Sequence, residues 1–199
     1  MRITTSWLLQ MFEIARIGRG VPIRVHWSVP AIALFILGTG YRHILIALAW
    51  VFSLLGIIVL HELGHHFAAR RLHYGVHAIS IYPLHGSCEH DAPHSQWHSV
   101  AIAWGGPLAQ LLVAIPFAIF VSFGRSTGID PLDVIIAVFA VYSPLVALFN
   151  LLPIAPLDGK TAWRIVPLLW RRIRHGRPQS IPQTPLEALQ DALRKAKRR

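Results

Sequence analysis

The sequence His61-Glu62-Leu63-Gly64-His65 closes a long apolar stretch, and the rest of the chain is best understood from it. On an α-helix, two residues four apart lie only about 40° from a common face. His61 and His65 can therefore present both imidazoles to one cation, which is a common way for a helix to hold Zn²⁺. Glu62 begins the same turn and could accept a proton from water at such a metal. The pattern predicts a metalloprotease, although five residues also recur by chance.

The residues before the motif favour a site inside a membrane. Residues 44–60 carry no charge, and Arg70 and Arg71 end the apolar segment that follows. As a helix, residues 44–60 would cover about 26 Å of a hydrocarbon layer about 30 Å thick. We therefore expect the motif within the membrane, near the face marked by the two arginines.

The composition agrees with a membrane bundle. Of the 199 residues, 54% are hydrophobic and only 14% are charged, which is too apolar for an ordinary soluble domain. The single cysteine, Cys88, excludes an internal disulfide. We predict a membrane all-α fold with short β-strands near the cytoplasmic face and about four transmembrane helices, at residues 25–41, 44–69, 100–123 and 132–152.

The net charge of +10 is distributed as in a membrane protein. Four spans place both termini on one side, and every lysine and arginine except Arg42 and Arg125 then lies on that side. The positive-inside rule makes this side cytoplasmic, together with the metal motif. We therefore expect an integral, multi-pass protein of a bacterial inner membrane and no nucleic-acid partner.

Three parts are predicted along the chain. Residues 1–20 form an amphipathic N-terminal segment, because apolar residues recur at helical spacing; this helix would lie on the membrane surface or pack on the bundle. Residues 21–175 form the membrane domain, which opens with an extended stretch at 21–27. Residues 176–199 form a basic cytoplasmic tail, whose simplest partner is the anionic lipid of the bilayer.

A catalytic zinc needs a third protein ligand, and Asp158 is the best candidate. It follows the last span in a proline-rich stretch, on the side where His61 and His65 are expected. An acidic residue at membrane depth indicates a functional site. The alternative is that Asp158 only caps a helix that begins at Gly159.

With these residues the chain resembles the site-2 protease family of intramembrane zinc metalloproteases. The resemblance runs from residue 17 to about 165 and includes the residues 17–28, which look like the family's N-terminal strand. The motifs that carry it appear in order along the chain: His61-Glu62-Leu63-Gly64-His65, Gly106-Pro107, Asn150-Leu-Leu-Pro153 and Leu157-Asp158-Gly159.

The resemblance implies a three-helix catalytic core, with one Zn²⁺ held by His61, His65 and Asp158 and with Glu62 as catalytic acid and base. It implies a zinc-dependent endopeptidase that cleaves a transmembrane segment of a membrane-protein substrate, as in regulated intramembrane proteolysis. The residues outside the core leave no room for PDZ or CBS modules, so we expect a minimal member.

Three positions depart from the family pattern. His85-Gly86 stands where paired glycines are usual, Gln110 where asparagine is usual, and Lys160 where a second glycine is common. No departure removes a metal ligand. They bear on substrate positioning more than on the chemistry.

A substrate helix must unwind before its peptide bonds can be attacked. Residues 76–84 are predicted to form a strand with an open edge, where Ser80 and Ile81 would hold the unwound segment by main-chain hydrogen bonds. Asn150 would bind the substrate backbone or the oxyanion. Alternatively, its amide satisfies backbone groups that Pro153 leaves free.

The histidine-rich residues 85–98 are predicted to form a polar segment. His90, His94 and His98 recur every fourth residue and could form a second metal site on one helical face, but a solvated loop is the commoner outcome. Cys88 is expected to be an ordinary small residue.

Two rival classes remain on the sequence alone. A metal-binding membrane transporter or sensor would use the histidines, but it would need polar residues in mid-span, where this chain has almost none. A catalytically inactive scaffold relative is the other. The intact residues His61, Glu62, His65 and Asp158 argue against it.

Overall fold

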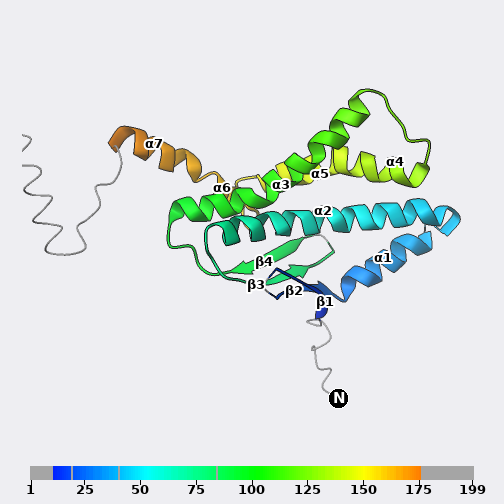
Figure 1. The fold of residues 1–199 in the computed structure, drawn as a ribbon, viewed down its shortest axis with the longest axis horizontal. Coiled ribbons are helices and arrows are strands. Elements are labelled where there is room, and N and C mark those ends of the chain that lie inside the picture. The colour runs from blue at the N-terminus through cyan, green and yellow to red at the C-terminus, as the bar shows by residue number, and fades with distance from the viewer. Residues whose placement is uncertain (1–10, 19, 40, 84, 176–199) are drawn as a thin grey trace, which may run out of the picture. The chain divides into compact units, whose positions relative to one another are not determined.

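The structure is a computed structural model that describes residues 11–18, 20–39, 41–83 and 85–175 (Figure 1). Its internal contacts divide the chain into two compact units, one ending at Arg164 and the other beginning at Ile165. The first unit contains the membrane helices and a small sheet. The unit boundary falls before the domain end that the sequence suggested at residue 175.

Three helices of the described chain are long and apolar enough to cross a membrane. Their outward side chains include many exposed large apolar residues, which suits contact with lipid. The helices lie in the last three of the four predicted spans, so the predicted helical membrane fold is confirmed. They are α2 (Ile44–Arg71), α3 (Gln96–Ser122) and a continuous helix made of α4 (Asp130–Ala137), the π-helical turn η3 (Val138–Tyr142) and α5 (Ser143–Asn150).

The first predicted span is shorter than expected. Helix α1 (Ser28–Thr39) has 12 residues, or about 18 Å, against a hydrocarbon layer of about 30 Å. The reason is that Val25 and His26 belong to a strand and that a 3-10 turn, η2 (Tyr41–His43), follows. Four complete spans therefore remain a prediction.

A four-stranded sheet packs beside the part of α2 that carries the metal motif (Figure 1). Its order is β1-β2-β3-β4, with β2 and β3 parallel and the two outer pairs antiparallel. Strand β2 precedes α1 and β3 follows α2, so the α1–α2 hairpin leaves the sheet and returns to it. The strands are β1 (Met11–Ile17), β2 (Val21–His26), β3 (Val76–Ile81) and β4 (Gly86–His90).

The sheet is held to α2 by apolar side chains. Ile23 of β2 lies opposite Ile79 of β3, and both are buried. Leu55, Ile58 and Leu63 of α2 pack against this cluster. One face of the sheet is thus fixed against the metal helix, which sets the register of β2 and β3.

Residues 11–17 form strand β1, so the predicted amphipathic helix is wrong over this part. Pairing with β2 supplies hydrogen-bond partners along the strand, with a register shift between Glu13 and Ala15. This tertiary pairing outweighs a spacing that also fits a helix. Residues 1–10 lie outside the described part of the chain.

The open edge predicted for residues 76–84 is also wrong. The strand exists as β3, but Ser80 pairs with Arg24 of β2 on one side and with Ser87 of β4 on the other. Ser80 and Ile81 are both buried. Because β3 is central, no backbone edge remains there for a substrate; the outer edge on this side of the sheet belongs to β4.

Strand β4 lies in the segment that the sequence suggested to be a polar loop. As a consequence, His90 ends a strand, His94 lies in a bend between β4 and α3, and His98 lies in the first turn of α3. The three histidines therefore do not share one helical face. Their regular spacing has no structural counterpart.

Helices α2 and α3 approach closely where the metal motif lies. A Cβ built on Gly105 of α3 would lie 2.6 Å from the carbonyl oxygen of Gly64, and a Cβ on Gly64 would overlap the Gly105 carbonyl. Two glycines thus allow the backbones to touch. Further along, α3 turns away from α2 (Figure 1), and its internal Pro107 and Pro116 account for that change of direction.

Candidate metal centre

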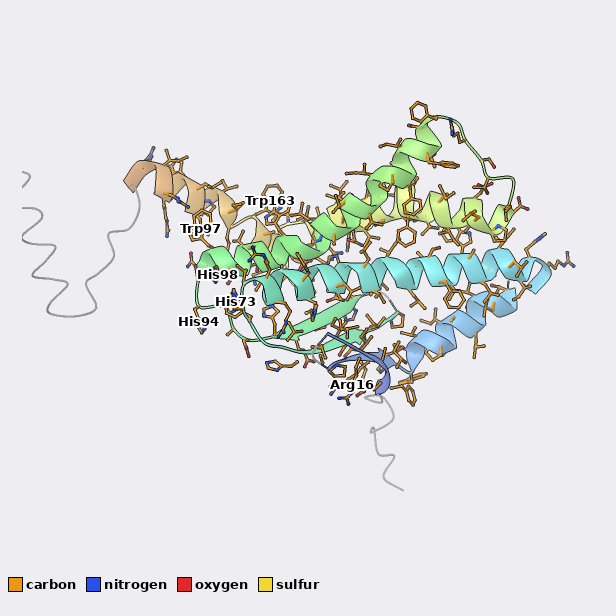
Figure 2. All side chains as sticks on the ribbon, in the orientation of Figure 1. Arg16, His73, His94, Trp97, His98 and Trp163 are labelled. Atoms are coloured by element: carbon orange, nitrogen blue, oxygen red, sulfur yellow. The ribbon has the colours of Figure 1, made fainter. Side chains whose placement is uncertain are left out.

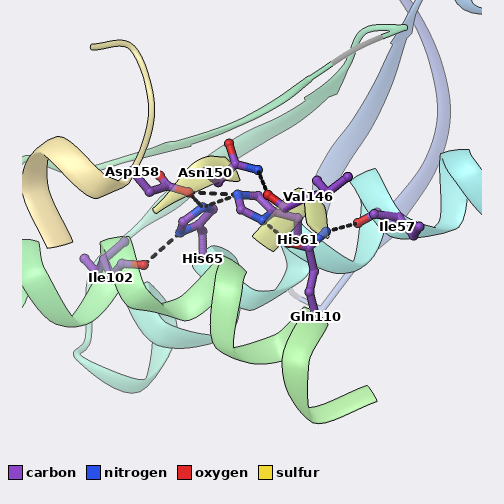
Figure 3. Close-up of polar contacts among 8 residues, drawn as sticks. All are labelled: Ile57, His61, His65, Ile102, Gln110, Val146, Asn150 and Asp158. Carbon is purple, nitrogen blue, oxygen red and sulfur yellow. Dashed lines mark hydrogen bonds and ion pairs between the residues drawn. The ribbon is translucent and has the colours of Figure 1, made fainter. Parts of the chain in front are cut away.

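Helix α2 places the histidine motif in the interior of the first unit. His61, Glu62 and His65 are all buried. The Nε2 atoms of His61 and His65 lie 3.0 Å apart, and their rings meet edge to face with centroids 4.6 Å apart. Figure 3 shows both imidazoles directed to one point. The helical spacing therefore produces the convergence that the sequence predicts.

Asp158 reaches the same point from a different part of the chain. Its Oδ2 lies 2.9 Å from His61 Nε2 and 3.2 Å from His65 Nε2 (Figure 3). Asp158 does occupy the N-cap position of α6 (Gly159–Ala162), but its side chain makes no capping hydrogen bond. The capping alternative is thus excluded as the role of the carboxylate, which faces the two histidines instead.

Two tryptophans fix the segment that carries Asp158. Trp163 donates its Nε1–H to the carbonyl oxygen of Leu151 at 2.6 Å. Trp104 of α3 donates its Nε1–H to the carbonyl oxygen of Ala162 at 3.1 Å, and the two indoles meet edge to face. Asp158 is therefore held between the end of α5 and α3 by contacts on its C-terminal side.

The remaining nitrogen of each histidine is also occupied. His65 Nδ1 lies 2.7 Å from the carbonyl oxygen of Ile102, and His61 Nδ1 lies 2.9 Å from Gln110 Oε1. The Gln110 amide is oriented by its Nε2, which donates to the carbonyl oxygen of Ile57 at 3.4 Å. Carbonyl and amide oxygens only accept, so both Nδ1 atoms carry hydrogen and both Nε2 atoms present lone pairs.

This donor set fits a divalent cation. Two imidazole lone pairs and a carboxylate oxygen converge, and only a shared proton or a bound cation can hold three such acceptors together. Ligand bonds of about 2.0–2.2 Å in a tetrahedral zinc site separate neighbouring ligand atoms by about 3.3–3.5 Å. The observed separations of 2.9, 3.0 and 3.2 Å are only slightly shorter.

Charge supports the same conclusion. Burial by itself raises the pKa of the Asp158 carboxyl, but without a cation the protons that His61 and His65 share with it outweigh burial and hold that pKa below the ordinary range. The carboxylate is therefore ionised at neutral pH, as a metal ligand must be. In the part of the chain that the structure describes, these three residues are the one group of His, Cys, Asp or Glu arranged to hold a metal.

A glycine leaves room for the cation. A Cβ built on Gly106 of α3 would lie 2.6 Å from His65 Nε2 and 2.7 Å from His61 Nε2. On the other side of the site, a Cβ on Gly86 of β4 would overlap the side chain of Glu62. Hydrogen at these two positions keeps the space beside the ligands and beside Glu62 open.

The site opens into a cavity of about 1080 Å³. Its lining includes the three ligands and Glu62, residues 85–88 at the start of β4, and the α5 side chains of Leu145 and Phe149. Ligand pockets usually have volumes of about 300–1,000 Å³, so this partly apolar cavity, bordered by a strand edge, is large for a binding site. Sequence reasoning did not foresee that β4 would form one wall.

Asn150 lines this cavity, but its amide nitrogen has an acceptor within its own helix. Its Nδ2 donates to the carbonyl oxygen of Val146 at 3.1 Å (Figure 3). The acceptor thus lies one turn before Asn150, not next to Pro153. A role of Asn150 toward substrate remains a prediction.

Cys88 lines the cavity but stands apart from the three ligands, and several histidines lie outside the site. Figure 2 shows His73, His94 and His98 near the end of α2 and the start of α3, where His98 Nδ1 lies 2.8 Å from the Tyr74 hydroxyl. Burial, followed by the negative charges of Glu62 and Glu89, raises the pKa of the Cys88 thiol to about 12. The thiol is therefore neutral at physiological pH, and Cys88 does not belong to the group of three residues arranged to hold a metal.

Taken together, a buried His-Glu-x-x-His helix with a distant aspartate, set among membrane-crossing helices, defines a membrane metalloprotein. The model of peptidase family M50 matches residues 49–135 of the chain. The solved structure of a site-2 protease from Methanocaldococcus jannaschii superposes with a TM-score of 0.65 and 24% identity, covering 79% of this chain and 71% of that one. Over residues 49–135 the chain is similar to peptidase family M50, and it shares the fold of a site-2 protease.

Two relatives are similar in sequence. The putative zinc metalloprotease Rip3 of Mycobacterium tuberculosis is 32% identical over 178 residues, which cover 79% of this chain and 43% of Rip3. The zinc metalloprotease MJ0392 of Methanocaldococcus jannaschii is 25% identical over 162 residues, which cover 81% of this chain and 46% of the relative. The chain thus spans less than half the length of either relative.

Proposed function

We propose that the protein is a zinc-dependent intramembrane endopeptidase that cleaves a transmembrane segment of a membrane-protein substrate. The observation that carries this proposal is the convergence of His61 Nε2, His65 Nε2 and Asp158 Oδ2 beside Glu62, in one cavity of a membrane-crossing bundle. The metalloprotease names of the relatives support it.

In the mechanism, His61, His65 and Asp158 would hold the metal, and Glu62 would move protons. Zinc bound there would lower the pKa of a water molecule and polarise the carbonyl of the scissile bond. Among the described residues that line the cavity, the one other acid is Asp158, whose carboxylate contacts the two histidines. Glu62 is thus the acid that is left for proton transfer. It would therefore accept the proton of the attacking water and return it to the leaving amine.

A substrate would bind in extended form. Peptide bonds in a helix are hydrogen-bonded and shielded, so the target segment must unwind before attack. Gly86, Ser87 and Cys88 of β4 line the cavity, and β4 is one of the two outer strands of the described sheet. An unwound segment could add to this edge by main-chain hydrogen bonds. This role replaces the one that the sequence suggested for Ser80 and Ile81.

We further propose that both termini and the zinc site face the cytoplasm, in a bacterial inner membrane. The return of the α1–α2 hairpin to one sheet supports placing the residues before α1 and after α2 on the same side. Arg70 and Arg71 at the end of α2 mark that side as cytoplasmic. Regulated proteolysis is the process in which such a cleavage would serve.

The proposal is tested with purified protein in proteoliposomes that also contain a single-span model substrate. The wild-type protein should cleave the substrate, whereas Glu62→Gln should retain zinc and release no product, because the amide cannot accept a proton. Cleavage at the wild-type rate by Glu62→Gln would show that the mechanism is wrong. Zinc flux across the vesicle without cleavage by the wild-type protein would favour a transporter, and neither activity would favour an inactive scaffold.

A further inference from the structure

The second unit begins with a helix whose apolar side chains are exposed. Helix α7 (Ile165–His175) carries exposed Val166, Leu169, Trp170 and Ile173, and the exposed fractions of Trp170 and Ile173 are 53% and 81%. These four residues follow the spacing i, i+3, i+4, i+7 and therefore share one face of the helix. An exposed apolar stripe on a helix needs an apolar medium to cover it.

The opposite side of α7 is basic. Arg171 lies across the helix from the apolar stripe, and Arg172 and Arg174 lie at its two borders, since successive residues are rotated by about 100°. Residues 165–175 contain no acidic side chain. The Arg174 guanidinium lies 3.8 Å from the centroid of the Trp170 ring. This cation–π pair lies where the apolar stripe meets the basic side of the helix. Tryptophan is enriched at the boundary between lipid and water, and the guanidinium can bind a lipid phosphate there.

Length excludes a spanning role for α7. Eleven residues extend about 16 Å, roughly half of the hydrocarbon thickness, and three arginines interrupt the sequence. A short helix with a strong apolar stripe and a basic opposite face lies in the plane of the membrane surface.

We propose that α7 is an in-plane anchor that binds an anionic lipid surface. Its apolar stripe enters the headgroup boundary, and Arg171, Arg172 and Arg174 bind the phosphates of acidic lipids. Charge complementarity favours an anionic lipid surface as the partner, because a helix with three arginines and no acidic residue is attracted to negative charge. The anchor is independent of the proposed peptidase activity, so that neither stands or falls with the other.

The test measures how deep two faces of α7 lie in the membrane. In a Cys88→Ala background, a spin label is placed at Ile173→Cys on the apolar face or, as the matched control, at Arg171→Cys on the basic face. Each full-length variant is reconstituted in vesicles of phosphatidylcholine with phosphatidylglycerol, and collisions with oxygen and with a water-soluble nickel chelate are recorded by EPR. Val166→Cys repeats the apolar position in case one label disturbs the helix.

The expected result is opposite accessibility on the two faces. Labels at positions 173 and 166 should collide mainly with oxygen, and the label at position 171 mainly with the nickel chelate. The difference should shrink in pure phosphatidylcholine or at high salt, where the attraction of the arginines is lost or screened. The proposal would be overturned if all three labels collided equally with the chelate in acidic vesicles, or if the labels were inaccessible to both reagents. A difference between the faces that did not change with lipid charge or salt would also overturn it.

Discussion

Replacing Gln110 with methionine should weaken zinc binding by about 10- to 100-fold, the range found when an outer-shell partner of a ligand is removed. Gln110 is fully buried, and its Oε1 accepts the hydrogen of His61 Nδ1 at 2.9 Å. Methionine has a similar length and no strong acceptor. The variant would leave a buried N–H without a partner and free the His61 ring to turn.

The structure sets the size of the effect. Because no surface of Gln110 is exposed, water cannot replace the lost acceptor. An unpaired buried donor costs about 1–3 kcal/mol, and each 1.4 kcal/mol corresponds to about a tenfold change in affinity. The loss therefore agrees with the 10- to 100-fold range. His65 should be unaffected, because its Nδ1 partner is the backbone carbonyl of Ile102.

The assay is competition for zinc between the detergent-purified apo protein and a coloured chelator. Ser53→Ala serves as the matched control, since Ser53 is a buried polar residue of α2, the helix that carries His61, and its hydroxyl makes no hydrogen bond. It should keep the wild-type affinity. An unchanged affinity in Gln110→Met, or an equal loss in Ser53→Ala, would refute the idea that Gln110 orients His61.

Three other outcomes are expected. Gly106→Ala should reduce zinc affinity about 5- to 150-fold, because fitting an extra methyl group beside the ligands costs about 1–3 kcal/mol. Gly56→Ala is the control, since its new methyl group would meet only the end of a phenylalanine ring at 3.2 Å. Equal zinc affinity in the two variants would contradict this prediction. Alkylation of Cys88 should be slow at pH 8 and should accelerate about tenfold per pH unit toward its pKa of about 12, since a raised pKa lowers the thiolate fraction; a rate that levels off near pH 9 would disprove it. Reporter fusions after Arg199 and within residues 124–128 should give opposite sidedness, and matching signals would refute the proposed topology.

The histidine motif could be predicted because its geometry is local. The spacing of His61 and His65 fixes their common face once the segment is a helix, and the long apolar stretch makes it one. Asp158 was within reach because few acidic residues lie near membrane depth. That the Asp158 carboxylate faces the histidines and does not cap α6 depends on how α6 packs, which the sequence does not show.

The features that sequence reasoning missed depend on contacts between distant segments. Gln110 orients His61 only because α3 lies against α2 at the glycine contact. Strand β4 is polar and short, without alternating apolar residues, and forms because β3 offers it an edge. The same pairing buries Ser80, and pairing with β2 turns residues 11–17 into a strand. Local periodicity carries no information on these partners.

The most direct test of the zinc site is the metal content of purified Asp158→Ala beside that of the wild-type protein. Asp158 comes from a segment far from the histidine motif, so its contribution tests the whole constellation instead of the helix alone. We expect one zinc per chain in the wild-type protein and clearly less in Asp158→Ala under the same chelator wash. Equal zinc in the two proteins would contradict the site as described, because it would place the metal on ligands other than His61, His65 and Asp158.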